Sequence, residues 1–259
     1  MNTGSLMLHC GAKYTTYDEL RWLDPSHHKP LTPTHRPTPH YIMRNQVVSS
    51  LQKLGQFEIT KEEIGISHKG KRCFGILELK QKDREMYEDY CMVYVWRNSN
   101  DFAFRGSVGT GSKVFNCDNL ALVAEWVVGA KHTLNVNNML VSRLDTLNET
   151  LKEQGLLMHE KYARYKNTSF GQPIADHIVF NAVRAKALPK TKILAVDKEW
   201  NNPSYKYEGS PWSAWKLFNA FTHVNKGLNY VDQIVRTQRL HKVFDDYLGM
   251  GENHQVRIA

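Results

Sequence analysis

The sequence predicts an α+β fold, in which an antiparallel β-meander is preceded by one helix and followed by a mainly helical C-terminal half. Two observations lead to this prediction. Apolar residues recur at helical spacing before residue 55, and three strand-like runs with short polar connectors then follow. From residue 119 onward, helical spacing returns and continues almost to the end of the chain.

The helix before the meander is expected at residues 41–54, ended by Gly55. Its apolar residues share one face: Ile42, Val47, Val48, Leu51 and Leu54. The three strands are expected at 57–66, 72–79 and 90–96, with a hairpin turn at Lys69-Gly70 between the first two.

The glycine-rich stretch at 106–111 is expected to be a turn between two short strands, at 102–105 and 113–117. It lacks the Gly-Lys-Ser/Thr ending of a Walker A loop. It also lacks the strand–loop–helix setting of a dinucleotide-binding fingerprint. Beyond it, helices are expected at 120–129, 136–156, 173–187, 212–224 and 231–248, with a loop at 188–209.

The first forty residues are expected to form an extended arm, because five prolines between residues 25 and 39 prevent a continuous helix. A short helix comes before these prolines, with Thr16 as N-cap and Glu19 at the third helical position. The predicted organisation is therefore an arm at 1–40, an α+β core at 41–135 and a helical region at 136–250, all in one continuous domain.

The charge balance favours a polyanionic partner. The chain has 34 Lys and Arg against 26 Asp and Glu, a net charge of +8, and an isoelectric point near 9.2. The excess is strongest at residues 161–192, where Asp176 is the one acidic residue. The basic residues there are Lys161, Arg164, Lys166, Arg184, Lys186, Lys190 and Lys192. The window is either a phosphate-contacting face or a solvated helix face.

The densest polar constellation lies between Arg97 and His132. Asp101 and Asp118 are weak candidates for holding a divalent metal, since hard cations prefer carboxylate oxygens. The alternative is that these side chains satisfy turn backbones and pair with nearby arginines. No other metal site and no cofactor is expected.

Three short motifs follow one another in this region: Arg97-Asn98-Ser99-Asn100-Asp101, then Val114-Phe115-Asn116-Cys117-Asp118-Asn119, then Lys131-His132-Thr133. With them the chain resembles the phage, plasmid and prophage family called domain of unknown function 932, over about residues 15–244. The motif residues are Asn98, Ser99, Asp101, Phe115, Cys117, Asp118, Asn119 and His132. The resemblance implies a mobile-element origin and supplies no catalytic residue.

The first function hypothesis is a single-strand DNA-binding or annealing protein of phage recombination or replication, assembled as a homo-oligomer. The helix and meander resemble in outline the core of ring-forming single-strand annealing proteins. Predicted nucleic-acid contacts are Arg97, Arg105, Lys113, Lys131, Lys161, Arg164, Lys166, Arg184 and Lys186 on phosphates, with Tyr162 and Tyr165 stacking on bases.

Two other hypotheses stay open. One is a non-enzymatic inhibitor of a host defence or restriction system, whose target is a host protein and whose contact is the proline-rich arm. The other is a metal-dependent nuclease built on Asp101, Asp118 and His132, with Mg²⁺ as a candidate ion. The four cysteines form no C-x-x-C pair, and no apolar run is long enough to span a bilayer. A cytoplasmic location in the host cell, without membrane association, is therefore expected.

Overall fold

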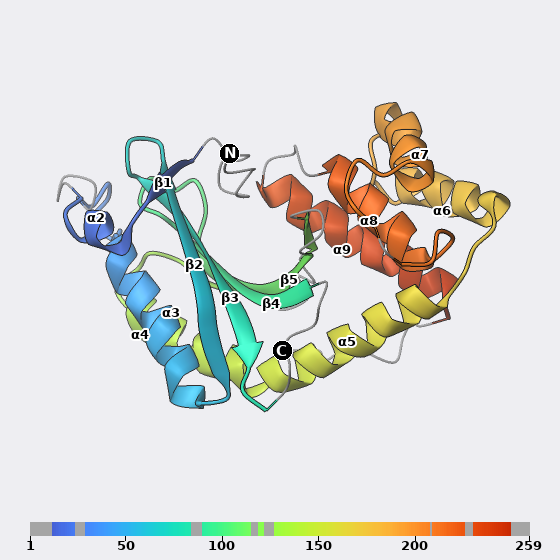
Figure 1. Ribbon diagram of the computed structural model, residues 1–259. Coiled ribbons are helices and arrows are strands. Elements are labelled where there is room, and N and C mark those ends of the chain that lie inside the picture. The colour runs from blue at the N-terminus through green and yellow to red at the C-terminus, as the bar shows by residue number, and fades with distance from the viewer. Residues whose placement is uncertain are drawn as a thin grey trace. The chain divides into compact units, whose positions relative to one another are not determined.

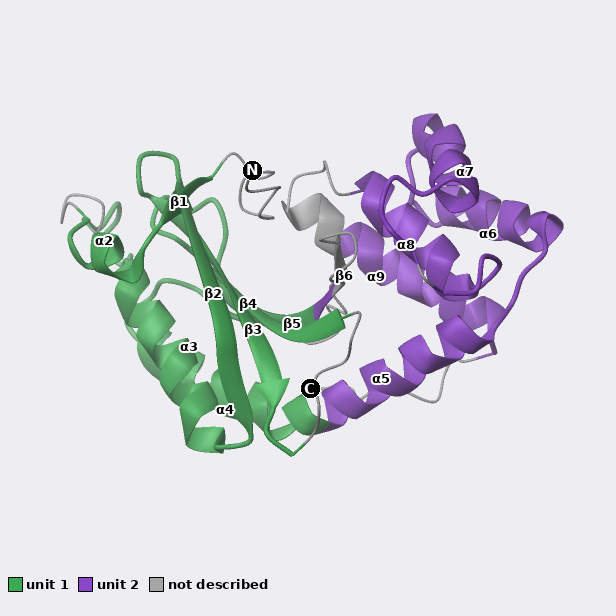
Figure 2. Cartoon of the chain, in the orientation of Figure 1, with its two compact units in different colours: residues 1–111, 126–152 green, residues 112–125, 153–259 purple. Residues whose placement is uncertain are grey.

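The computed structural model describes residues 12–23, 29–83, 90–114, 119–121, 127–207, 209–225 and 230–249 (Figure 1). The α+β prediction is confirmed, because an antiparallel sheet occupies the first half and helices dominate the second. The chain forms two compact units (Figure 2). Unit 1 comprises residues 1–111 and 126–152, and unit 2 comprises residues 112–125 and 153–259. This division differs from the predicted boundaries, since the first helix after residue 135 belongs to unit 1.

The sheet contains the predicted meander with longer strands. Its strands are β1 (Lys13–Thr15), β2 (Phe57–Ser67), β3 (Arg72–Gln81), β4 (Tyr90–Ser99), β5 (Gly106–Val114), β6 (Asn119–Ala121) and β7 (Val127–Ala130). In unit 1 the order is β1-β2-β3-β4-β5, and β7 also pairs with β5. In unit 2, β6 pairs with the last residues of β5. The ladders β1–β2, β2–β3 and β3–β4 are antiparallel. For β2–β3 and β3–β4 this is expected, because short connections join these strands.

The helices of unit 1 follow the sequence closely. They are α2 (Tyr17–Arg21), α3 (His40–Leu54) and α4 (Val136–Glu149). The predicted capping box of α2 is confirmed, because Thr16 and Glu19 bond each other's backbone N–H groups. Gly55 ends α3 in the left-handed conformation, with φ of 67°. Helices α3 and α4 pack side by side, and α3 also contacts β2 and β4 (Figure 1).

The glycine-rich stretch is not a turn, so that prediction is wrong. Residues 106–111 lie inside β5, where Gly106 and Gly109 are Cα partners of Ala130 and Val127 in β7. A Cβ on Gly129 would lie 3.0 Å from the carbonyl oxygen of Gly106, so glycine serves here for close strand approach. The predicted strand at 102–105 is an irregular turn, and the predicted helix at 120–129 is replaced in its described parts by β6 and β7.

Unit 2 is helical. Its elements are α5 (Leu151–Asn167, of which residues 151–152 belong to unit 1), α6 (Gln172–Arg184), η2 (Lys190–Lys192), α7 (Ile193–Asn201), α8 (Ala214–Asn225) and α9 (Tyr230–Tyr247). The single helix predicted at 136–156 is broken at Thr150 into α4 and α5. The loop predicted at 188–209 instead holds α7, whose Val196 and Trp200 are buried one turn apart. None of the described helices is both long and apolar enough to cross a bilayer.

Gly75→Ala is expected to destabilise unit 1. Gly75 and Trp96 are Cα partners in the β3–β4 ladder, and a Cβ on Gly75 would overlap the indole ring of Trp96. Trp96 is 1% exposed, so the ring has no free space to move into. Overpacking of this kind lowers the free energy of unfolding by roughly 1–3 kcal/mol, which a shift in the urea midpoint would measure.

The matched control for this substitution is Gly106→Ala. A Cβ at Gly106 would meet its nearest neighbours at 3.6–3.7 Å, which is ordinary van der Waals contact. Its urea midpoint is expected to stay close to that of the parent. Equal midpoints for both variants would contradict the proposed overlap at Trp96.

Candidate nucleic-acid interface

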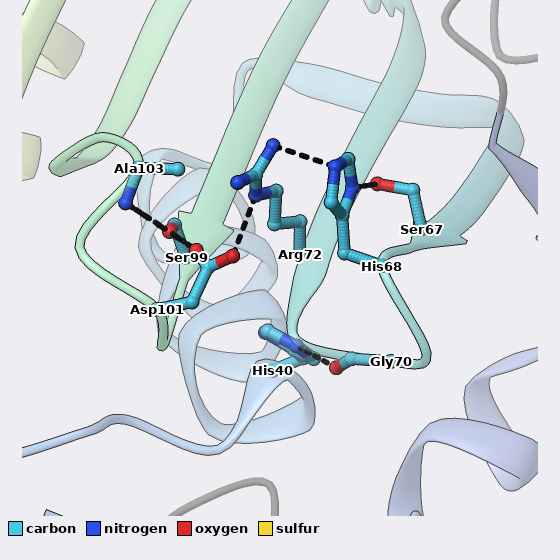
Figure 3. A network of polar contacts seen from close by, with 8 residues as sticks. All are labelled: His40, Ser67, His68, Gly70, Arg72, Ser99, Asp101 and Ala103. Atoms are coloured by element: carbon cyan, nitrogen blue, oxygen red, sulfur yellow. Dashed lines mark hydrogen bonds and ion pairs between the residues drawn. The ribbon is translucent and has the colours of Figure 1, made fainter. Parts of the chain in front are cut away.

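The motif residues Ser99 and Asp101 clamp the turn that follows β4. The hydroxyl of Ser99 donates to Oδ1 of Asp101 at 2.5 Å and accepts the N–H of Ala103 at 3.1 Å (Figure 3). Nε of Arg72 donates to Oδ2 of Asp101 at 2.8 Å, and Nη1 of Arg72 donates to Nε2 of His68 at 2.9 Å. The turn is therefore tied to the β2–β3 hairpin by charge-assisted hydrogen bonds.

Asn98 joins the arm to α3. Its amide nitrogen donates to the carbonyl oxygen of Thr38 at 2.7 Å and lies 2.8 Å from Nδ1 of His40. Nε2 of His40 in turn lies 2.8 Å from the carbonyl oxygen of Gly70 (Figure 3). Because that carbonyl can only accept, Nε2 carries the proton and Nδ1 accepts from Asn98. Asn98 is fully buried, so its contacts are structural.

The metal candidates receive no ligand set from the described residues. Partial burial opposes the ionisation of Asp101, but the hydrogen bonds from Ser99 and Arg72 outweigh it and hold the pKa of Asp101 below its usual value. Both carboxylate oxygens of Asp101 are hydrogen-bonded. Within the part of the chain that the structure describes, no three His, Cys, Asp or Glu side chains gather at a possible metal site. Asp118 lies outside the described residues.

The clamped turn presents Phe102 to solvent. This residue has φ of 61°, in the left-handed region, and is 55% exposed. Its ring centroid lies 4.3 Å from that of the buried His35. We call Phe102, Arg36, Arg105 and Lys131 the motif surface.

The three cations of the motif surface are brought together by backbone contacts. Gly106 and Ala130 are Cα partners, so Arg105 and Lys131 directly flank the end of the β5–β7 ladder. The N–H of Arg36 donates to the carbonyl oxygen of His132 at 3.0 Å. All three cations are exposed, and none forms an ion pair with a carboxylate of the described residues.

A second cationic surface lies in unit 2, where α6 ends. We call Arg184, Lys186, Lys190 and Lys192 the basic segment. All four are exposed, and no carboxylate in the described ranges lies within ion-pair distance of them. The guanidinium of Arg184 lies 4.8 Å from the ring centroid of Phe180, which is itself 55% exposed.

Three residues predicted to bind nucleic acid lie in the interior of unit 2, so this part of the prediction is wrong. Tyr162 and Tyr165 are both 0% exposed. Their rings pack on Trp215 and Phe218, with centroids 4.6 and 5.4 Å apart, so neither ring can stack on a base. Lys161 is buried, and its Nζ lies 2.8 Å from Oδ2 of Asp245. The physical reason is that Tyr162 and Tyr165 lie one turn apart on the face of α5 that is buried.

The remaining predicted contacts are dispersed. Arg97 lies over the ring of Phe104 at 4.7 Å, and Lys166 lies 5.7 Å from the ring centroid of Trp215. Nη2 of Arg164 donates to the carbonyl oxygen of Leu248 at 2.5 Å, and Lys113 is half-buried in β5. The structure thus groups Arg105 with Lys131 at the end of the β5–β7 ladder. Arg184 and Lys186 are two residues apart in the chain, where α6 ends. Of the second motif, Phe115, Cys117 and Asp118 lie outside the described residues, and Asn119 begins β6.

Phe102, Phe180 and Arg36 were not predicted from the sequence. Phe180 had a detectable signal, since it precedes Arg184 by four residues and falls outside the apolar stripe of its helix. Phe102 had none, because the clamp that holds its turn includes Arg72, which lies 29 positions before Asp101 in the chain.

Comparisons with known protein families, with curated proteins and with solved structures find no match to this chain.

Proposed function

We propose that the protein binds nucleic acid, and that the basic segment contacts the phosphates. The observation that supports this proposal is that four exposed cations fall within nine residues, with no ion-pairing carboxylate in the described part of the chain. Cations left unneutralised in this way attract a polyanion and release its condensed counterions on binding. The net charge of +8 adds a general attraction.

Single-stranded DNA is the proposed ligand. Phe180 lies beside Arg184 and leaves ring surface exposed, and a base with an open face can stack on such a ring. A role in annealing, as a homo-oligomer encoded by a mobile element, is the finer proposal. It draws on the order of the three motifs and on the helix-and-meander outline.

Removing three charges of the basic segment is expected to weaken binding and to reduce its salt dependence. The variant is Arg184→Gln, Lys190→Gln and Lys192→Gln. Binding of a fluorescent single-stranded oligonucleotide would be measured by anisotropy between about 50 and 200 mM salt. Each lost phosphate contact lowers the slope of log K against log salt by about 0.7, so a decrease of about 2 is expected.

The control removes the same number of charges elsewhere, from the exposed cations Lys53, Lys82 and Arg143 of unit 1. Its slope is expected to match that of the parent. The proposal would be overturned if the parent protein does not bind the oligonucleotide at low salt, or if its affinity does not change with salt concentration. Recovery of one stoichiometric host protein without nucleic acid would then favour the inhibitor hypothesis.

A further inference from the structure

We infer that the motif surface is a second nucleic-acid site, at which an unpaired base stacks on Phe102 while Arg36, Arg105 and Lys131 contact the neighbouring phosphates. The inference goes beyond the proposed function, because it assigns a site in unit 1 and specifies an open base as the group recognised. It shares with the proposed function only the class of ligand.

Phe102 has an unusual backbone conformation for an exposed aromatic residue. A bulky aromatic residue at φ of 61° occupies a region that such residues rarely adopt, because the Cβ approaches the backbone. The ring nevertheless stays largely in solvent, since the residue is 55% exposed. Strained residues that stay exposed are typical of ligand contacts, where the surrounding structure holds them in place.

The turn that carries Phe102 is held by hydrogen bonds and by a ring contact. Ser99, Asp101 and Arg72 hold the turn from one side through the hydrogen bonds of Figure 3. The ring of His35 packs against the ring of Phe102 with an interplanar angle of 37°. Nδ1 of His35 in turn accepts the N–H of Leu31 at 3.1 Å. A platform that is already ordered loses little conformational freedom when a ligand binds.

Positive charge surrounds the ring of Phe102. Two hydrogen bonds hold the guanidinium of Arg36 beside the backbone of His35: Nη1 donates to the carbonyl oxygens of Pro33 and His35 at 2.9 and 3.0 Å. Arg105 and Lys131 approach from the ends of β5 and β7. An aromatic ring among unpaired cations fits a nucleotide, which offers a flat base and a charged phosphate.

The ligand is expected to be single-stranded. A ring that projects from a turn can stack only on a base whose face is open, and in a duplex both faces are covered by neighbouring base pairs. The site therefore distinguishes strands by the availability of base faces rather than by their sequence.

The experiment compares an oligonucleotide with the same oligonucleotide in which the bases are replaced by abasic positions. The parent protein is expected to bind the intact strand more tightly. Phe102→Ala is expected to reduce this preference by about fivefold or more, which corresponds to the loss of one stacked base, while the salt slope stays unchanged. Phe102→Trp is expected to retain the preference.

Phe102→Gly distinguishes a loss of base stacking from a loss of protein stability. Glycine adopts positive φ without strain, so this variant is expected to be at least as stable as Phe102→Ala while losing the preference for bases to the same extent. Trp22→Ala, which removes another exposed ring of unit 1, is the control and is expected to leave the preference unchanged.

The outcomes distinguish this inference from the proposed function. If binding depends on salt but Phe102→Ala keeps the full preference for bases, the stacking site is overturned. The proposed role of the basic segment is then unaffected. An equal loss of preference in Trp22→Ala would also overturn it. The absence of any binding at low salt would overturn both.

Discussion

Asp245→Ala is expected to lower the free energy of unfolding by about 1–3 kcal/mol, the usual cost of leaving a largely buried donor without its acceptor. Oδ2 of Asp245 lies 2.8 Å from Nζ of Lys161, and Oδ1 accepts the hydroxyl of Tyr165 at 2.9 Å. Both partners are buried, so alanine leaves a cation and a hydroxyl without their acceptor inside unit 2. The loss would be measured by urea unfolding at neutral pH.

The neighbouring residue provides the control. Asp246 is exposed, and Asp246→Ala is expected to change the free energy of unfolding by less than about 0.5 kcal/mol. The conservative change Asp245→Asn keeps an oxygen acceptor but removes the charge, so its effect should fall between the two. Equal stabilities for the alanine variants at 245 and 246 would show that Lys161 finds another acceptor.

Acidification from about pH 6.5 to pH 4 is expected to destabilise the protein through His132 by up to about 3 kcal/mol. Burial lowers the pKa of His132 to about 4, and the nearby His35 adds to the shift. In the unfolded chain a histidine titrates near 6.5. Between these two values the unfolded state binds more protons than the folded state, so stability falls as the pH falls.

His132→Gln is expected to flatten this dependence, and His177→Gln, at an exposed position, is expected to leave it unchanged. Some pH dependence should remain in His132→Gln, because burial, with a contribution from Lys161, lowers the pKa of His241 well below its usual value. The measurement is urea unfolding at a series of pH values. A parent protein with constant stability from pH 6.5 to 4 would contradict the burial of a neutral imidazole.

Local patterns predicted much of the fold. The apolar stripe and Gly55 located α3, because helix spacing and a left-handed stop are both properties of a few consecutive residues. The capping box of α2 and the meander of β2, β3 and β4 were predicted for the same reason. Hairpin strands pair with their neighbours in sequence, so their alternation is enough to identify them.

The predictions that proved wrong depend on contacts between residues that are distant in the sequence. Residues 106–111 have the composition of a turn, and they form β5 because β7 supplies hydrogen-bond partners some twenty residues later. Tyr162 and Tyr165 lie in a basic window, and they are buried because α8 and α9 cover that face of α5 with Trp215, Phe218 and Phe244. Their burial depends on helices that a local window does not contain.

Periodicity and composition are enough to predict the α+β class, the helix-and-meander core and the surplus of positive charge. They do not predict which cations stay in solvent without a carboxylate partner, because this depends on how the chain folds. Lys161 and Arg184 share one basic window, yet Lys161 contacts Asp245 in the interior while Arg184 remains exposed beside Phe180. An ion pair needs a carboxylate that folding brings close, and the one beside Lys161 comes from a residue 84 positions away in the chain.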